Sequence, residues 1–126
     1  FRILYLQIII TVKLFFLMMT EMDAQDRSLC ERQADFCGIF TNPARIRIML
    51  ELGDGERSVG ELAEALGVPL PNLSQHLRLM RDRGCVRGRK EGKHVYYAVT
   101  SPAFIEAMLL VRRGIEDSDR QRVSGR

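Results

Sequence analysis

Apolar and polar residues follow one another along this 126-residue chain with the periods of several helices and one β-hairpin. Five segments repeat apolar side chains every three or four residues, which is the spacing of one helix face. These segments are residues 26–40, 43–52, 58–67, 71–83 and 102–116. After the fourth segment the period changes to two, which predicts strands at residues 85–89 and 93–100 and a turn at residues 90–92. The pattern predicts a mainly α fold with a small β-hairpin.

Residues at the ends of these segments support the predicted helix boundaries. Asn42 suits the cap of the second helix, and Pro43 suits its first position, where no N–H is needed. Ser58 and Glu61 form a capping box at the start of the third helix. Gly67 ends that helix, because glycine takes the left-handed conformation at little cost.

Two helices have apolar faces that predict what they pack against. Leu73, Leu77 and Met80 recur on one face of the fourth helix, and we expect them in the core. The last helix is apolar over a broader surface, which predicts that a partner covers it. Its apolar residues are Phe104, Ile105, Met108, Leu109, Val111 and Ile115.

Residues 1–21 form an apolar N-terminal extension whose origin the sequence leaves open. Residues 3–19 are strongly apolar but slightly short of the roughly 20 residues that span a bilayer. We favour the interpretation that this is translated upstream sequence and that the native start is Met18, Met19 or Met22. A membrane anchor and an additional helix packed on the domain are the alternatives.

The remaining chain divides into one folded domain and a tail. A chain of this length suits a single domain, which we place at residues 26–116. Residues 117–126 have no apolar pattern, so we expect a flexible tail there.

Positive charge gathers on the fourth helix and the hairpin. The chain has a net charge of +3, but residues 71–97 hold seven basic and two acidic residues, a local net charge of +5. A local excess larger than the global one indicates a face that meets a polyanion. A solvated charged surface is the less specific interpretation.

Helices 58–67 and 71–83 are short and joined by a tight turn, which is typical of a helix-turn-helix that reads duplex DNA. The second helix fits the major groove, where small polar side chains reach base edges. The candidates for base reading are Asn72, Ser74, Gln75 and His76. His76 is equally well explained as a hydrogen-bonded helix residue.

The basic residues around this helix are candidates for phosphate contacts, and the hairpin then serves as a wing. Such contacts release counterions and raise affinity but carry little sequence information. The candidates are Arg78, Arg81, Arg83, Arg87, Arg89, Lys90 and Lys93. We interpret Tyr96 and Tyr97 as packing residues of the hairpin.

Four stretches, "NPARIRIMLEL", "SVGELAEALGV", "NLSQHLRLMRDRG" and "VRGRKEGKHVYYAV", resemble the ArsR/SmtB family of winged helix-turn-helix repressors. The resemblance covers about residues 35–99. It implies a homodimer formed by the first and last helices, bound to a two-fold symmetric operator. It also implies a repressor that a metal, a metalloid or a thiol-directed signal releases from DNA.

The family's known sensor sites are hard to place on this sequence. Ser58 and Gly60 occupy the positions where arsenic-sensing members often carry two cysteines, and the last helix has no histidine for a zinc site. The metal ligands are therefore unknown. Cys30, Cys37 and Cys85 are candidate sensor thiols, or else small apolar residues of the interior.

The spacing of the cysteines limits what they can do. Cys30 and Cys37 are about 10.5 Å apart along a helix, too far to clamp one ion or to form a disulfide by themselves. Cys85 opens the wing, so its modification would disturb DNA binding directly. An odd number of cysteines at low density favours a reducing cytoplasm.

No phosphate loop, nucleotide fingerprint or nucleophile elbow occurs in the sequence, so we do not expect an enzyme or a resident cofactor. Duplex DNA and a second copy of the chain are the expected partners, and a membrane is not. Two alternatives remain: a winged-helix module that binds an acidic protein, and a regulator tethered to a membrane by residues 1–21.

Overall fold

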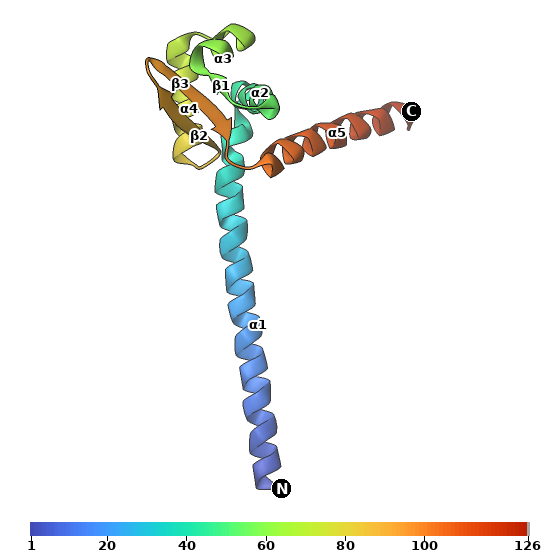
Figure 1. Cartoon of the computed structure of the whole chain (residues 1–126). Coiled ribbons are helices and arrows are strands. Elements are labelled where there is room, and N and C mark those ends of the chain that lie inside the picture. The colour runs from blue at the N-terminus through green and yellow to red at the C-terminus, as the bar shows by residue number, and fades with distance from the viewer. Residues whose placement is uncertain (126) are drawn as a thin grey trace. The chain divides into compact units, whose positions relative to one another are not determined.

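The computed structural model describes residues 1–125 and consists of two units (Figure 1). The first is Phe1–Cys37, and the second begins at Gly38. In the first unit, α1 (Arg2–Cys37) is one continuous helix of 36 residues. The sequence predicted a helix only from residue 26, because the apolar N-terminal half of α1 has no helical period. Residues 2–37 contain neither glycine nor proline, so no residue interrupts the helix before Gly38.

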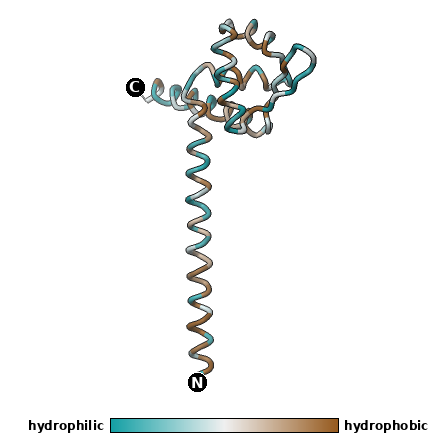
Figure 2. The backbone as a smooth tube through the Cα atoms, turned by 90° about the vertical axis from the view of Figure 1, so that its left-hand side faces the viewer, coloured by the Kyte–Doolittle hydropathy of each residue, from teal (hydrophilic) through white to brown (hydrophobic). Residues whose placement is uncertain are grey.

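The N-terminal half of α1 is the most apolar part of the chain, as Figure 2 shows. Its 18-residue apolar window has a mean hydropathy of 2.0, and none of that window is buried. By length and composition, this helix is the one in the described residues that is suited to cross a membrane. The origin of residues 1–21 stays a prediction.

The second unit holds the helices that the sequence predicted. They are η1 (Gly38–Thr41), α2 (Pro43–Glu51), η2 (Leu52–Asp54), α3 (Val59–Leu66) and α4 (Leu70–Asp82). Both predicted caps form: Asn42 accepts a hydrogen bond from the Ala44 N–H at 2.9 Å, and Ser58 accepts one from the Glu61 N–H at 3.1 Å. Gly67 ends α3 in the left-handed conformation, with φ 63°.

A three-stranded antiparallel sheet completes the body of this unit. Its strands are β1 (Arg57–Ser58), β2 (Val86–Glu91) and β3 (His94–Val99), in the order β1-β3-β2. The predicted turn at residues 90–92 begins two residues too early and ends one residue too early. Glu91 pairs with His94, which leaves only Gly92 and Lys93 between the strands. Gly92 has φ +59° while Lys93 does not have positive φ, the pattern of a type II′ hairpin turn.

The core lies between α2, α3, α4 and the sheet. Leu73, Leu77 and Met80 have no exposed surface, so the predicted inward face of α4 is confirmed. They pack with apolar side chains from the other elements of the unit. The fully buried members of this core include Ile39, Met49, Leu62 and Cys85.

The last helix, α5 (Pro102–Ser124), begins as predicted and ends later. Ser101 caps it by accepting a hydrogen bond from the Ala103 N–H at 3.3 Å. The helix continues through most of the predicted tail, to Ser124, and the flexibility of that segment stays a prediction. No glycine or proline occurs between residues 115 and 124, and Asp117 pairs with Arg120 one turn later. Residue 126, the end of the predicted tail, lies outside the described residues.

Candidate nucleic-acid interface

The outward face of α4 is polar because its inward face is fully used by the core. Asn72, Ser74, Gln75 and Arg78 are all exposed, on the side away from the buried residues. Arg47 of α2 donates through Nη2 to the Leu66 carbonyl at 3.0 Å and so ties the end of α3 to α2. The exposed side chains of α4 present hydrogen-bonding groups of the size that major-groove base edges accept.

His76 differs from the other three candidate base readers. It is half-buried, and its Nδ1 accepts a hydrogen bond from Arg45 Nε at 3.4 Å. Arg45 in turn donates through Nη1 to the Ile39 carbonyl at 3.0 Å. The histidine thus links α4 to α2, a role that agrees with its alternative interpretation as a hydrogen-bonded helix residue.

The wing is held together by its two tyrosines. Tyr97 is buried, and a Cβ atom on its cross-strand neighbour Gly88 would lie 3.3 Å from the Tyr97 ring. Glycine at position 88 therefore gives the ring its space. Tyr96 is half-buried beneath the Arg89 guanidinium, whose carbon lies 4.8 Å from the ring centroid. The predicted packing role of the tyrosines is confirmed.

Arg89 is engaged by two carboxylates as well as by Tyr96. Its Nη2 lies 2.6 Å from Glu56 Oε1 and its Nη1 lies 2.6 Å from Glu91 Oε2. The hydrogen bond from Arg89 lowers the pKa of the Glu56 carboxyl, and the two carboxylates together raise the pKa of Arg89. Sequence reasoning did not single out Glu56, because 33 residues separate the partners and no local pattern joins them.

The other candidate phosphate contacts differ in how far they are engaged. Arg87 donates through Nη1 to the Val99 carbonyl at 3.2 Å, and Arg81 lies 3.5 Å from the carboxylate of Asp82. Arg83 is the C-cap residue of α4, and its guanidinium lies next to Gly38. Three of the exposed candidates take part in neither an ion pair nor a side-chain hydrogen bond within residues 1–125. They are Arg78, Lys90 and Lys93.

A cleft joins the end of α4 to the wing. It has a volume of about 360 Å³. Its lining combines three cations with small and apolar wing residues: Arg81, Gly88, Arg89, Lys90, Val95 and Tyr97. The cleft therefore joins the C-terminal end of α4 to basic residues of the wing, and whether this surface meets a polyanion stays a prediction.

The three candidate sensor cysteines lie in different environments. Cys30 and Cys37 are exposed on α1, whereas Cys85 is buried. The Cys85 Sγ lies 3.2 Å from the Met49 Sδ, and burial raises the pKa of this thiol to about 11. Within the described chain, no three His, Cys, Asp or Glu side chains are grouped as a metal site.

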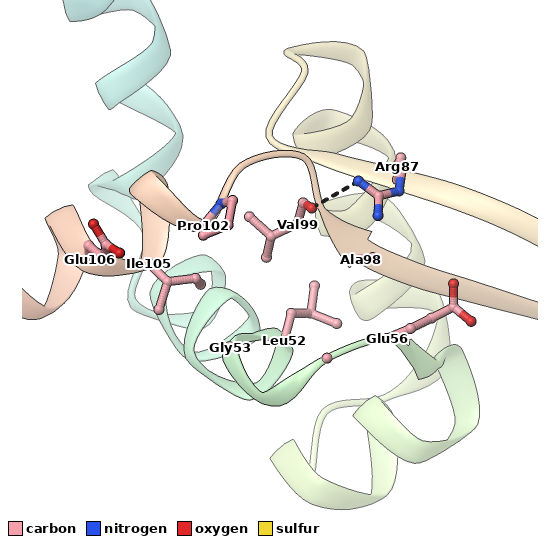
Figure 3. Close-up of a pocket in the computed structure, with 10 residues that line it drawn as sticks. Leu52, Gly53, Glu56, Arg87, Ala98, Val99, Pro102, Ile105 and Glu106 are labelled. Carbon is pink, nitrogen blue, oxygen red and sulfur yellow. Dashed lines mark hydrogen bonds between the residues drawn. The ribbon is translucent and has the colours of Figure 1, made fainter.

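A second, larger pocket of about 440 Å³ lies where α5 begins (Figure 3). Leu52, Val99 and Ile105 line it, together with the charged residues Arg87 and Glu106. This pocket was not predicted, because its walls come from η2, the two long strands and α5, and only the fold brings these elements together.

Comparison with known proteins identifies the family. A family profile described as a helix-turn-helix domain matches residues 40–89. Rv0081, an uncharacterized HTH-type transcriptional regulator of Mycobacterium tuberculosis, is 34% identical over 90 residues, which are 71% of this chain and 79% of the relative. The chain belongs to the ArsR/SmtB family of transcriptional regulators. The SmtB repressor of Mycobacterium tuberculosis, 37% identical over 56% of this chain and 53% of its own length, agrees with that assignment.

Solved structures of ArsR/SmtB-like proteins match the fold. The crystal structure of Mycobacterium tuberculosis Rv0081 aligns with a TM-score of 0.68 at 34% identity, over 75% of this chain and 96% of that one. A homodimeric winged helix-turn-helix domain from Mycobacterium bovis, described as possibly ArsR-family, aligns with a TM-score of 0.68 at 26% identity, over 77% and 90%. The predicted family, the winged helix-turn-helix fold and the function of a DNA-binding transcriptional repressor are confirmed.

Proposed function

We propose that this ArsR/SmtB protein is a cytoplasmic, non-enzymatic repressor that binds a two-fold symmetric operator as a homodimer. In this proposal α4 enters the major groove and the wing lies along the flanking phosphates. The observation that carries it is the exposed polar face of α4, together with the cleft that joins the C-terminal end of this helix to basic residues of the wing.

Three side chains on α4 are proposed to read bases. Asn72, Ser74 and Gln75 are exposed near its N-terminal end, and glutamine has the geometry to bond adenine at two atoms. His76 takes a secondary place, because its ring is already bonded to Arg45. Arg78, Lys90 and Lys93 are the proposed principal phosphate contacts, with Arg81, Arg83 and Arg87 around them.

The dimer is supported by α5 and by the relative from Mycobacterium bovis. α5 exposes a row of large apolar side chains, and that relative is a homodimer. The exposed residues are Leu109, Leu110, Val111 and Ile115. A symmetric pair would present two copies of α4 to successive major grooves, about 34–36 Å apart.

The inducer of this repressor is proposed to be thiol-directed. Cys30 and Cys37 are exposed to such a signal, whereas the Cys85 thiol is buried and protonated at neutral pH. We therefore expect a thiol reagent to modify Cys30 and Cys37 in the folded chain and Cys85 only in denaturant. Mass spectrometry of alkylated peptides measures this, and a native Cys85 that reacts as fast as Cys30 would contradict it.

A gel shift on the DNA upstream of the chain's own gene tests the function. We expect binding that weakens steeply as salt rises, because phosphate contacts release counterions. Gln75→Ala should lower the preference for the operator by about 1–3 kcal/mol, and Lys93→Ala should weaken all duplexes alike. If both variants bind like the parent, or if the parent binds no duplex, the proposed reading surface is wrong.

A further inference from the structure

Arg89 is the most heavily engaged basic residue of the wing. Three of its nitrogen atoms donate hydrogen bonds to carboxylates. Nε donates to Glu56 Oε2 at 3.3 Å, Nη2 to Glu56 Oε1 at 2.6 Å, and Nη1 to Glu91 Oε2 at 2.6 Å. The fork of two bonds to Glu56 is the bidentate geometry in which a guanidinium binds a carboxylate most specifically. The Tyr96 ring lies beneath the same guanidinium, whose carbon is 4.8 Å from the ring centroid.

The partners of Arg89 connect the wing to the start of the helix-turn-helix. Arg89 pairs with Tyr96 across the hairpin, and Tyr96 pairs with Ser58 in β1. Ser58 is the residue that caps α3, and Glu56 lies two residues before it. The Arg89–Glu56 fork therefore spans the sheet from its outer strand, β2, to the segment that leads into α3.

The charge of this cluster argues against a phosphate contact. One guanidinium and two carboxylates carry a net charge of −1, so the cluster as a whole does not attract a phosphate. Lys90 and Lys93 lie nearby in the wing, and neither takes part in an ion pair within residues 1–125. The wing thus contains two classes of cation, one that is neutralised and one that is available.

We infer that Arg89 is a positioning residue, which holds the wing against the entry to α3 while Lys90 and Lys93 contact the phosphates. The inference rests on the proposed function and adds a division of labour to it. A single exposed ion pair contributes little to stability. Here one side chain is restricted by a bidentate fork, a second carboxylate and a stacked ring together. The orientation of the wing is then set before it binds DNA, which lowers the entropic cost of ordering the wing on binding.

The test compares the salt dependence of DNA binding in charge-matched variants. The chain, kept in solution with a non-ionic detergent, binds a duplex that the parent has selected from a random-sequence pool. R89Q/E56Q removes the fork without changing net charge, and R89K keeps the charge but loses the fork. Lys93→Gln is the matched control at the tip of the same hairpin.

A positioning role and a phosphate contact give opposite results. We expect R89Q/E56Q to lower affinity about three- to tenfold, the equivalent of ordering one or two extra side chains, without changing the salt slope. R89K should lose nearly as much. Lys93→Gln should reduce the magnitude of the slope by about 0.9, as one lost phosphate contact does.

Three outcomes of the DNA-binding measurements would overturn the inference. They are a slope of R89Q/E56Q reduced by about 0.9, an R89K variant that binds like the parent, and an R89Q/E56Q variant with parental affinity. Circular dichroism checks that each variant is folded. Hydrogen exchange of the free chain separates this inference from the proposed function: faster exchange of β2 and β3 amides in R89Q/E56Q than in Lys93→Gln supports the fork even if the parent binds no duplex, and equal exchange rejects it.

Discussion

α4 and the β2–β3 wing meet at one cleft, but different forces hold them in place. α4 is anchored by Leu73, Leu77 and Met80, all without exposed surface, whereas Val86 is the one buried residue of β2. Burial of apolar area is not screened by salt, while exposed ion pairs such as those of Arg89 are. The comparison shows that α4 is anchored by a full apolar face, whereas the wing combines a few buried side chains, Val86 and Tyr97, with polar contacts at its surface.

The largest effect should come from the buried side of α4. We expect Leu77→Ala to lower the free energy of unfolding by about 2–5 kcal/mol, because it removes buried methyl groups and leaves a cavity. Urea unfolding followed by circular dichroism measures it. Gln75→Ala, on the exposed face of the same helix, is the control and should change stability by less than about 0.5 kcal/mol. Equal stabilities of the two variants would show that the core does not anchor this helix.

A smaller effect is expected at Cys85, where the core meets the wing. Its pKa is raised from 9.0 to about 11 by burial, so the folded chain keeps the thiol proton in a range where the unfolded chain releases it. The contribution of the protonated, buried thiol to the free energy of unfolding is fully present below pH 9. It is lost as the pH rises toward 11, by about 2–3 kcal/mol in total. Urea unfolding at pH 8, 9 and 10 measures it, with Cys85→Ala as the control that lacks this decrease. If the free energy of unfolding changes with pH in the same way in both proteins, the deprotonation of Cys85 is not the cause of the decrease.

The parts of the fold that follow from neighbouring residues were predictable from the sequence. The caps at Asn42 and Ser58 and the inward face of α4 depend on spacings of two to four residues, and all of them are present. The length of α1 was missed, because an apolar run without a period does not show where a helix begins.

The contacts that join distant segments were not predictable from the sequence. Both Glu56 with Arg89 and Arg45 with His76 pair residues more than thirty positions apart. The sequence showed a polar, basic surface at α4 and the wing. It did not show which of those side chains the protein uses on itself, because only the sheet register brings Arg89 to Glu56.

The smallest of these effects concerns the tip of the wing. Gly92 has φ +59°, which costs an alanine about 1 kcal/mol, so Gly92→Ala should lower stability by about that amount. Gly60→Ala is the matched control, because a Cβ atom there meets only the Ser58 Oγ at 3.9 Å and alanine favours the helix, so stability should rise by up to about 1 kcal/mol. Urea unfolding of both variants measures the two opposite changes in the free energy of unfolding. Because Lys93 is the other residue of the turn, Gly92→Ala should also weaken DNA binding while Gly60→Ala does not, and a wing variant with parental affinity would show that the position of its tip does not matter.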